Sequence, residues 1–311
     1  MKRAIAYRIL QAFLVALVVG VLTFLMVRML PGDLAYRIAA GRYGYDMVST
    51  AAAEAVRHEL GLDRSGLLVF IQWFWDMIRF DLGYSLVTGE LVRDTLLHEL
   101  GHSIDLAFTA LVLSMCLGPP LGMVAGIRPG GLVDRVVLAA SVVLRSIPQF
   151  AIGAVLILLF SVKLGWLPAA GHGQFADKIL PALTLALGMA ALSSRIARDA
   201  TIRVRSSEYY QFGRTKGLAE WQVFFRHGLR NISVPVVTYL GMQFVYLIEG
   251  VVVVESLFAW PGIGHGLVHA IFGRDVPMVQ GAALVMGLMF VGLNTLVDVI
   301  NRVLDPRRVT A

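Results

Sequence analysis

Six long apolar segments constrain how this chain of 311 residues can fold more than any other feature. A helix that crosses the hydrocarbon core of a bilayer needs about 20 predominantly apolar residues. Only 15% of the residues are charged, whereas a typical soluble domain carries about 25%. We therefore predict an all-α membrane protein with six transmembrane helices, at residues 9–29, 103–127, 136–162, 179–197, 234–254 and 281–303.

The distribution of Lys and Arg among the connecting segments predicts the orientation of these helices. Short loops that are rich in Lys and Arg stay on the cytoplasmic side of a membrane. With six crossings, the basic clusters at 2–8, 128–135, 198–230 and 302–308 all lie on one side. We therefore expect a multi-pass protein of the bacterial inner (cytoplasmic) membrane with both termini in the cytoplasm. The net charge of +6 then reflects topology in membrane lipid and does not indicate a nucleic-acid partner.

Two segments outside the predicted helices are too long to be simple connections. Residues 31–98 are expected to form a periplasmic insert, which separates the N-terminus and first helix (1–30) from a five-helix core (99–311). The segment at about 198–231 predicts a helix, a break at Gly217 and a second helix. Such a segment is either a helix on the lipid surface or a docking element for a cytoplasmic partner. No A-x-A cleavage site follows the first apolar segment, so we expect that segment to be retained.

Short motifs outside the apolar segments form an ordered series. They are Pro31-Gly32-Asp33, Leu60-Gly61-Leu62-Asp63, Asp81-Leu82-Gly83-Tyr84-Ser85, Asp134-Arg135, Pro148-Gln149-Phe150, Trp166-Leu167-Pro168, the long segment 208–231, Trp260-Pro261-Gly262, Arg274-Asp275 and Asp305-Pro306-Arg307. In order and spacing, over the whole chain, the series resembles the permeases of the dipeptide, oligopeptide and nickel ABC importer family. The chain departs from importers of this fold at Gln211-Phe212-Gly213, where Glu-Ala-Ala is common.

The resemblance implies a type I ABC importer permease fold and a defined set of partners. These are a second homologous permease subunit, two ATP-binding subunits and a periplasmic solute-binding protein. The implied solutes are di- or oligopeptides, with nickel or another small solute as the alternative. Since the sequence has no G-x-x-x-x-G-K-[ST] phosphate loop, we expect a transporter subunit that is not an enzyme and binds no cofactor, with ATP and Mg on the partner subunits.

The segment around Gly217 is implied by the resemblance to be the coupling helix, which enters a groove on the ATPase. A short helix with a glycine-set angle can transmit a rigid-body push, and basic flanks can pair with acidic residues of a partner. The implied docking residues are Glu208, Tyr209, Gly213, Lys216, Gly217, Leu218, Ala219, Glu220 and Arg226.

A competing motif, H-E-x-x-H, occurs at residues 98–102. On a helix, His98 and His102 would share a face and could bind zinc, with Glu99 as general base, as in metalloproteases. The longer metzincin pattern requires Gly and His further on, where the chain has Asp105 and Phe108. A cluster of His98, His102 and Asp105 remains as a remote metal site, and an intramembrane zinc metalloprotease remains as the remote alternative function.

Two ionisable residues lie within the predicted helices and are candidates for the translocation path. Arg145 lies in the third segment and Glu249 in the fifth. A charge inside the membrane indicates function by default, although pairing between helices is the simpler explanation. The two residues either pair with each other or face the path. As relay residues they would instead indicate an ion-coupled secondary carrier.

Overall fold

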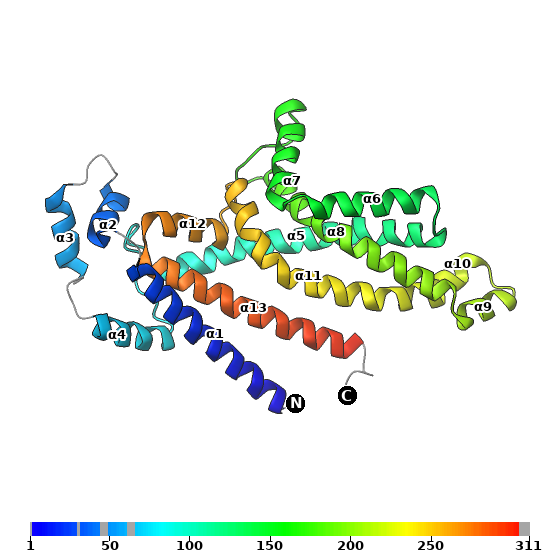
Figure 1. Cartoon of the computed structure of the whole chain (residues 1–311), viewed down its shortest axis with the longest axis horizontal. Helices are drawn as coiled ribbons and strands as arrows, with labels where there is room; N and C mark the ends of the chain where they lie inside the picture. The colour runs from blue at the N-terminus through cyan, green and yellow to red at the C-terminus, as the bar shows by residue number, and fades with distance from the viewer. Residues whose placement is uncertain (1, 30–31, 44–48, 61–65, 305–311) are drawn as a thin grey trace. The chain divides into compact units, whose positions relative to one another are not determined.

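The computed structural model describes residues 2–29, 32–43, 49–60 and 66–304, and the regular structure in these ranges is helical. Some side chains within them, including that of Glu249, lie outside the described part. Figure 1 labels most of the helices. Their bounds are α1 (Lys2–Met29), α2 (Leu34–Tyr43), α3 (Thr50–Leu60), α4 (Gly66–Ile78), α5 (Val92–Ile127), α6 (Leu132–Ser146), α7 (Gln149–Leu156) with its π-helical continuation η2 (Ile157–Lys163), α8 (Phe175–Arg205), α9 (Glu208–Thr215), α10 (Glu220–Val223), the π-helix η3 (Phe224–Gly228), α11 (Leu229–Leu257), α12 (Ile263–Gly273) and α13 (Val276–Leu304).

Helices of membrane-spanning length and composition account for most of the apolar segments. Three are long and apolar enough by themselves, at Val92–Ile127, Phe175–Arg205 and Val276–Val299. Two pairs of helices, each bent at a short break, bring the total in the described part to five if each pair is one span. The apolar part of α1 in the described residues, Leu10–Thr23, is shorter than a full membrane span. The predicted all-α membrane fold is confirmed, whereas the count of six spans stays a prediction.

The third predicted helix is not continuous, and this prediction was wrong in one respect. Residues 136–162 fall into α6 and α7, which meet at an angle of 106°. Ile147 has an extended backbone (φ −94°, ψ 130°), and Pro148 caps α7. Proline has no N–H group, and its ring disfavours helical geometry in the preceding residue, so the helix ends at Ser146. The break brings the end of α6 and the start of α7 close to each other.

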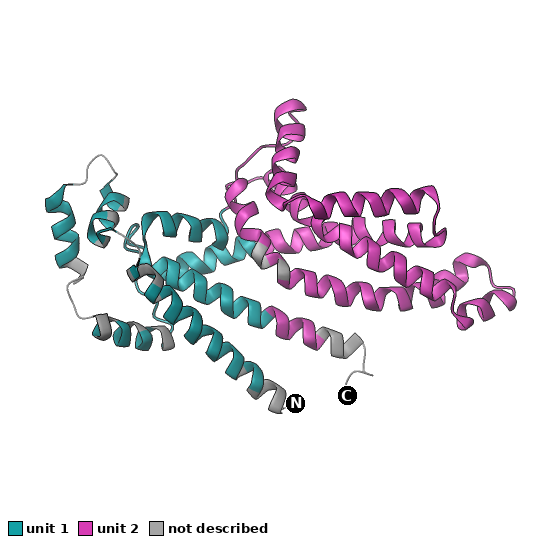
Figure 2. Cartoon of the chain, in the orientation of Figure 1, with its two compact units in different colours: residues 1–103, 261–292 teal, residues 104–260, 293–311 magenta. Residues whose placement is uncertain are grey.

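The chain divides into two compact units (Figure 2). The boundaries predicted from the sequence, at residues 30 and 98, stay a prediction. The first unit comprises 1–103 and 261–292. Its core includes Leu96 of α5 and Ile263 of α12, both buried. In the same unit, Asp275 accepts hydrogen bonds from the hydroxyl of Ser85 and from the N–H of Leu86, the latter at 3.1 Å. These bonds join the 81–91 loop to the start of α13.

The second unit comprises 104–260 and 293–311, and α8 is its central helix. Helix α8 packs against α6, α7 and α11, and Leu180, Leu185 and Phe258 are among the buried side chains of its core. Helix α5 also lies very close to α8, because a Cβ atom added at Gly122 would lie 2.7 Å from the carbonyl carbon of Ser194. Small residues at such contacts are typical of helices that pack within a membrane.

Candidate functional site

The segment predicted to dock an ATPase folds into a helical elbow, which we define as residues 206–228. It lies at the ends of α8 and α11 and consists of α9, a turn, α10 and η3 (Figure 1). Gly217 in the turn has a φ of +82°, a conformation that residues with a side chain rarely adopt. The predicted pattern of helix, break and helix is confirmed, with the break at Gly217.

A buried tyrosine and a shared carboxylate hold the two halves of the elbow together. Tyr210 is fully buried, and its hydroxyl donates to Glu220 Oε1 at 3.2 Å. The same carboxylate pairs with Arg205 Nη1 at 2.7 Å and Arg214 Nε at 3.3 Å. Burial raises the pKa of Tyr210, and the charge of Glu220 raises it further, so the hydroxyl stays protonated and remains a donor. Through the carboxylate of Glu220, these contacts link α10 to the end of α8 and to α9.

Replacing Tyr210 with Phe tests this framework, because it removes only the donor to Glu220. A hydrogen bond to a charged group contributes about 1.5 kcal/mol, so we expect amide exchange in residues 206–220 to become roughly tenfold faster. Tyr209→Phe is the matched control, since Tyr209 is 44% exposed and on the same helix. Hydrogen exchange of the purified importer, read by mass spectrometry, measures both variants. Equal exchange in the two would contradict the role of the Tyr210 hydroxyl.

The predicted docking residues divide into an outer and an inner group. Gly213 is buried, and a Cβ atom there would lie 3.1 Å from Val223 of α10. Leu218 is half-buried against the core of the second unit. These two residues therefore shape the elbow instead of presenting a surface. The exposed members are Glu208, Tyr209, Lys216, Gly217, Ala219, Glu220 and Arg226.

Among the exposed aromatic side chains of the elbow, sequence analysis singled out Tyr209 but not the other three. Phe212, Trp221 and Phe225 are 60%, 65% and 64% exposed, and the ammonium group of Lys216 lies 4.5 Å from the ring centroid of Phe212. Aromatic residues are enriched in the cores of protein interfaces, so exposed ones on the same short segment are consistent with such an interface. These residues could have been found from the sequence, because they are large apolar residues within a charged segment that connects two apolar segments.

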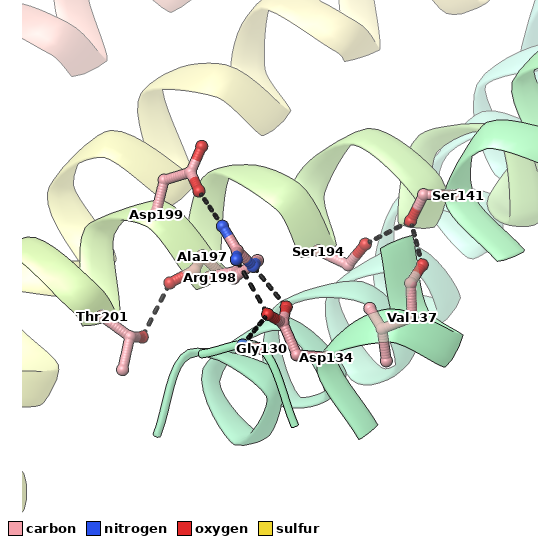
Figure 3. Close-up of polar contacts among 9 residues, drawn as sticks. All are labelled: Gly130, Asp134, Val137, Ser141, Ser194, Ala197, Arg198, Asp199 and Thr201. Atoms are coloured by element: carbon pink, nitrogen blue, oxygen red, sulfur yellow. Dashed lines mark hydrogen bonds and ion pairs between the residues drawn. The ribbon is translucent and has the colours of Figure 1, made fainter. Parts of the chain in front are cut away.

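A buried ion pair joins α6 to α8 (Figure 3). Asp134 is 2% exposed and accepts hydrogen bonds from Arg198 Nε and from Arg198 Nη2, the latter at 2.8 Å. The N–H of Gly130 donates to the same carboxylate at 2.7 Å, which fixes the loop before α6. Arg198 Nη1 also donates to Asp199 at 2.8 Å. The sequence motif Asp134-Arg135 was noted, but its partner lies 64 residues further along the chain.

Hydroxyl groups continue the contact between α6 and α8 along their length (Figure 3). The hydroxyls of Ser141 and Ser194 lie 3.1 Å apart, and both residues are buried. Ser141 also donates to the carbonyl of Val137 at 2.8 Å. Small polar residues of this kind allow close approach of membrane helices and contribute hydrogen bonds between them.

A cavity of about 570 Å³ lies in the second unit, and Arg145 is one of its lining residues. The others come from α7, α8 and α11. Glu249 belongs to α11, but its side chain lies outside the described residues, so its pairing with Arg145 stays a prediction. The complete lining is Arg145, Gln149, Gly188, Met189, Leu192, Tyr239, Gln243, Leu247 and Gly250.

The two histidines of the H-E-x-x-H motif face each other on α5. Their Nε2 atoms are 3.3 Å apart, and their rings meet edge to face at 4.7 Å. Asp105, the predicted third ligand, instead forms an ion pair with Lys178. The predicted cluster of His98, His102 and Asp105 is therefore not formed as a set of ligands.

The glutamate of the motif takes part in a different arrangement. Glu99 lies against Gly266 of α12, and it lines a cavity of about 300 Å³ together with His265 and His269. Across the described ranges, no three His, Cys, Asp or Glu side chains are placed so that they could hold a metal ion. The arrangement gives no support to zinc-dependent hydrolysis.

Two family models together match almost the whole chain. The model described as "Binding-protein-dependent transport system inner membrane component" matches residues 118–310. The model for the N-terminal part of such membrane components matches residues 1–107. The boundary between the two models falls within α5.

Individual relatives are similar over nearly their full length. One, from Brucella abortus (strain 2308), has the provisional name of peptide transport system permease protein and is 38% identical over 99% of both chains. Another, the glutathione transport system permease protein of Escherichia coli (strain K12), is 37% identical over 93% of both chains.

Solved structures of two ABC transporters share the fold at low sequence identity. A methionine ABC transporter in an inward-facing conformation has a TM-score of 0.56 and 18% identity, covering 68% of this chain and 96% of the other. An amino acid ABC transporter crystallised with histidines has a TM-score of 0.53 and 14% identity, covering 68% and 94%. At these identities the likeness concerns the fold alone.

Proposed function

The chain belongs to the family of binding-protein-dependent transport system inner membrane components, and on this premise we propose that it forms part of a path for di- or oligopeptides. It is a multi-pass permease subunit of an ABC importer and not itself an enzyme. Such a permease works with ATP-binding and substrate-binding partners. The zinc metalloprotease and the secondary carrier are therefore not favoured.

The peptide assignment is supported by the relatives over the full length of the chain. One is named for peptides and another for glutathione, which is a modified tripeptide. Nickel or another small solute is the alternative within the same importer class. The absence of a three-ligand metal cluster in the described ranges gives the nickel alternative no added support.

We further propose the assembly and its orientation. The chain would pair with a second homologous permease and with two ATP-binding subunits, and a periplasmic binding protein would deliver the solute. The elbow carries this proposal, because it combines a rigid internal framework with exposed aromatic and basic side chains. Its basic content supports a cytoplasmic location, with both termini on the same side of the inner membrane.

Reconstituted transport tests the proposal directly. The complete importer is placed in liposomes with its binding protein, and uptake of labelled di- and tripeptides is measured with and without ATP. We expect uptake that requires ATP and is competed by unlabelled peptide. Importer in which the ATP-binding subunits are catalytically inactive is the control. ATP-dependent uptake of Ni²⁺ that peptides neither compete with nor replace would refute the peptide assignment.

A further inference from the structure

The cavity of the second unit combines one cationic group with neutral hydrogen-bonding groups. Arg145 lies in the last turn of α6, and Gln149 follows directly after the Pro148 break. Tyr239 and Gln243 contribute from α11. Among the side chains that the structure describes, no Asp or Glu lines this cavity. Its polar chemistry is therefore that of an anion site with additional donors and acceptors.

The position of Gln149 is fixed by glycines on two neighbouring helices. A Cβ atom at Gly250 of α11 would lie 3.2 Å from the Gln149 carboxamide carbon, and one at Gly188 of α8 would lie 3.2 Å from its Nε2. The carboxamide thus occupies space that side chains at these two positions would fill. Met189, Leu192 and Leu247 supply apolar lining beside it. The arrangement holds a polar group at a defined place within an apolar surrounding.

Arg145 lies in a segment predicted to cross the membrane, where a charged side chain has a physical cost that calls for a matching gain. Within a membrane, an Arg side chain costs about 2.5–3.5 kcal/mol at the helix centre, and such residues face cavities or water-filled paths. Guanidinium groups bind carboxylates through two parallel hydrogen bonds, and amide side chains bind peptide groups. The cavity volume of about 570 Å³ falls within the ~300–1,000 Å³ that is usual for small-molecule sites.

We propose that this cavity contacts the solute during passage and that Arg145 binds its terminal carboxylate, while Gln149 and Gln243 contact its peptide groups. The permease itself then favours solutes with an anionic end, in addition to the selection made by a binding protein. This inference rests on the proposed importer function and names the chemical feature of the solute that the path recognises. The break at Pro148 is what places Arg145 and Gln149 on the same cavity.

The charge preference of the cavity can be measured without any solute. In importer with Cys116→Ser and Gln243→Cys, the introduced thiol is modified by methanethiosulfonates that carry either a sulfonate or a trimethylammonium group. Mass spectrometry of this chain gives the ratio of the two rates. We expect Arg145→Gln to lower the ratio of sulfonate to trimethylammonium modification about tenfold, because the positive charge is removed from the cavity lining. Arg135→Gln on the same helix is the matched control and should leave the ratio unchanged.

Two results of this labelling would overturn the proposal. One is an unchanged ratio in Arg145→Gln, and the other is a thiol that neither reagent reaches. The labelling is independent of what the importer carries, so failure of the peptide assignment leaves its outcome readable. Glu249→Gln separates ion pairing from anion binding. If Glu249 neutralises Arg145, this variant should raise the ratio several-fold, and the anion site is refuted because the charge of Arg145 is already paired. A ratio close to that of the unmodified protein supports the anion site.

Uptake by Arg145 variants that retain Gln243 and Cys116 tests the contact with the solute. With saturating binding protein, Arg145→Gln should lower the maximal rate for a free-acid tripeptide by about tenfold or more, with KM unchanged, because a charge-assisted hydrogen bond is lost. Arg145→Lys should recover part of the rate, and the C-terminally amidated peptide should be insensitive to either change. Equal losses for the acid and the amide would indicate a structural role for Arg145 and would reject the carboxylate contact.

Discussion

Replacing Trp221 with Asp should reduce ATP-driven uptake by at least about 30-fold and release the ATP-binding subunits during purification. Trp221 is 65% exposed on the elbow, together with Phe212 and Phe225. Central aromatic residues of an interface contribute about 2 kcal/mol or more when they are truncated, and a buried carboxylate adds a desolvation cost. The loss should therefore appear both as a lower rate and as a weaker complex.

The surroundings of Trp221 make it the sharper choice for testing docking than Gly217 or Leu218. Charged replacements at Gly217 or Leu218 should also abolish transport, but Gly217 has a positive φ and Leu218 packs on the core. Changes at these two positions would distort the elbow itself, so they cannot separate docking from folding. Trp221 has an exposed side chain, and its replacement leaves the contacts of Tyr210 with Glu220 in place.

Trp166→Asp is the matched control for this prediction. Trp166 is 69% exposed, lies between η2 and α8, and is predicted to be on the opposite side of the membrane from the elbow. This variant should retain the ATP-binding subunits. Co-purification and the uptake rate are measured for both variants in membranes that contain equal amounts of this chain. Retention of the ATP-binding subunits and of full uptake by Trp221→Asp would show that Trp221 of the elbow does not dock them.

The sequence was sufficient to predict features that depend on local pattern. Long apolar runs predicted the helices, and a glycine in a charged segment predicted the break between α9 and α10. The same reasoning placed Pro148 inside a continuous span, because an apolar run predicts burial in lipid but not a straight axis. Steric exclusion by proline overrode the pattern, and the helix broke before it.

Contacts between distant residues were beyond what the sequence alone could supply. Asp134 and Arg198 are separated by 64 positions, and no spacing rule connects them. Glu220 is predicted to dock a partner, which stays a prediction, and the structure adds contacts of its carboxylate with Tyr210, Arg205 and Arg214. A charged residue in a loop looks the same in sequence whether it faces a partner or its own chain. The contacts of Glu220 within its own chain could therefore be seen only in the structure.

Replacing Asp134 with Ala should destabilise the protein by about 2–3 kcal/mol, the largest loss of stability we expect from a single polar substitution. Removing one member of a fully buried ion pair costs about 3–5 kcal/mol, because the remaining charge is left without its partner. Arg198 is 19% exposed and keeps its bond to Asp199, so the loss should fall below that range. Thermal unfolding in lipid nanodiscs should show a transition several degrees lower than in the unmodified protein.

The same arginine provides the control for this prediction. Asp199→Ala removes an ion pair whose acidic side chain is 54% exposed, and exposed pairs contribute about 0–1 kcal/mol. Asp134→Leu combined with Arg198→Met removes both charges and should recover most of the stability, since an apolar pair of similar size often matches a buried ion pair. If Asp134→Ala and Asp199→Ala unfold at the same temperature, the junction of α6 and α8 does not depend on the buried pair. Because α8 continues from Arg198 to Arg205, which binds Glu220 of the elbow, loss of the pair should also lower uptake relative to ATP hydrolysis.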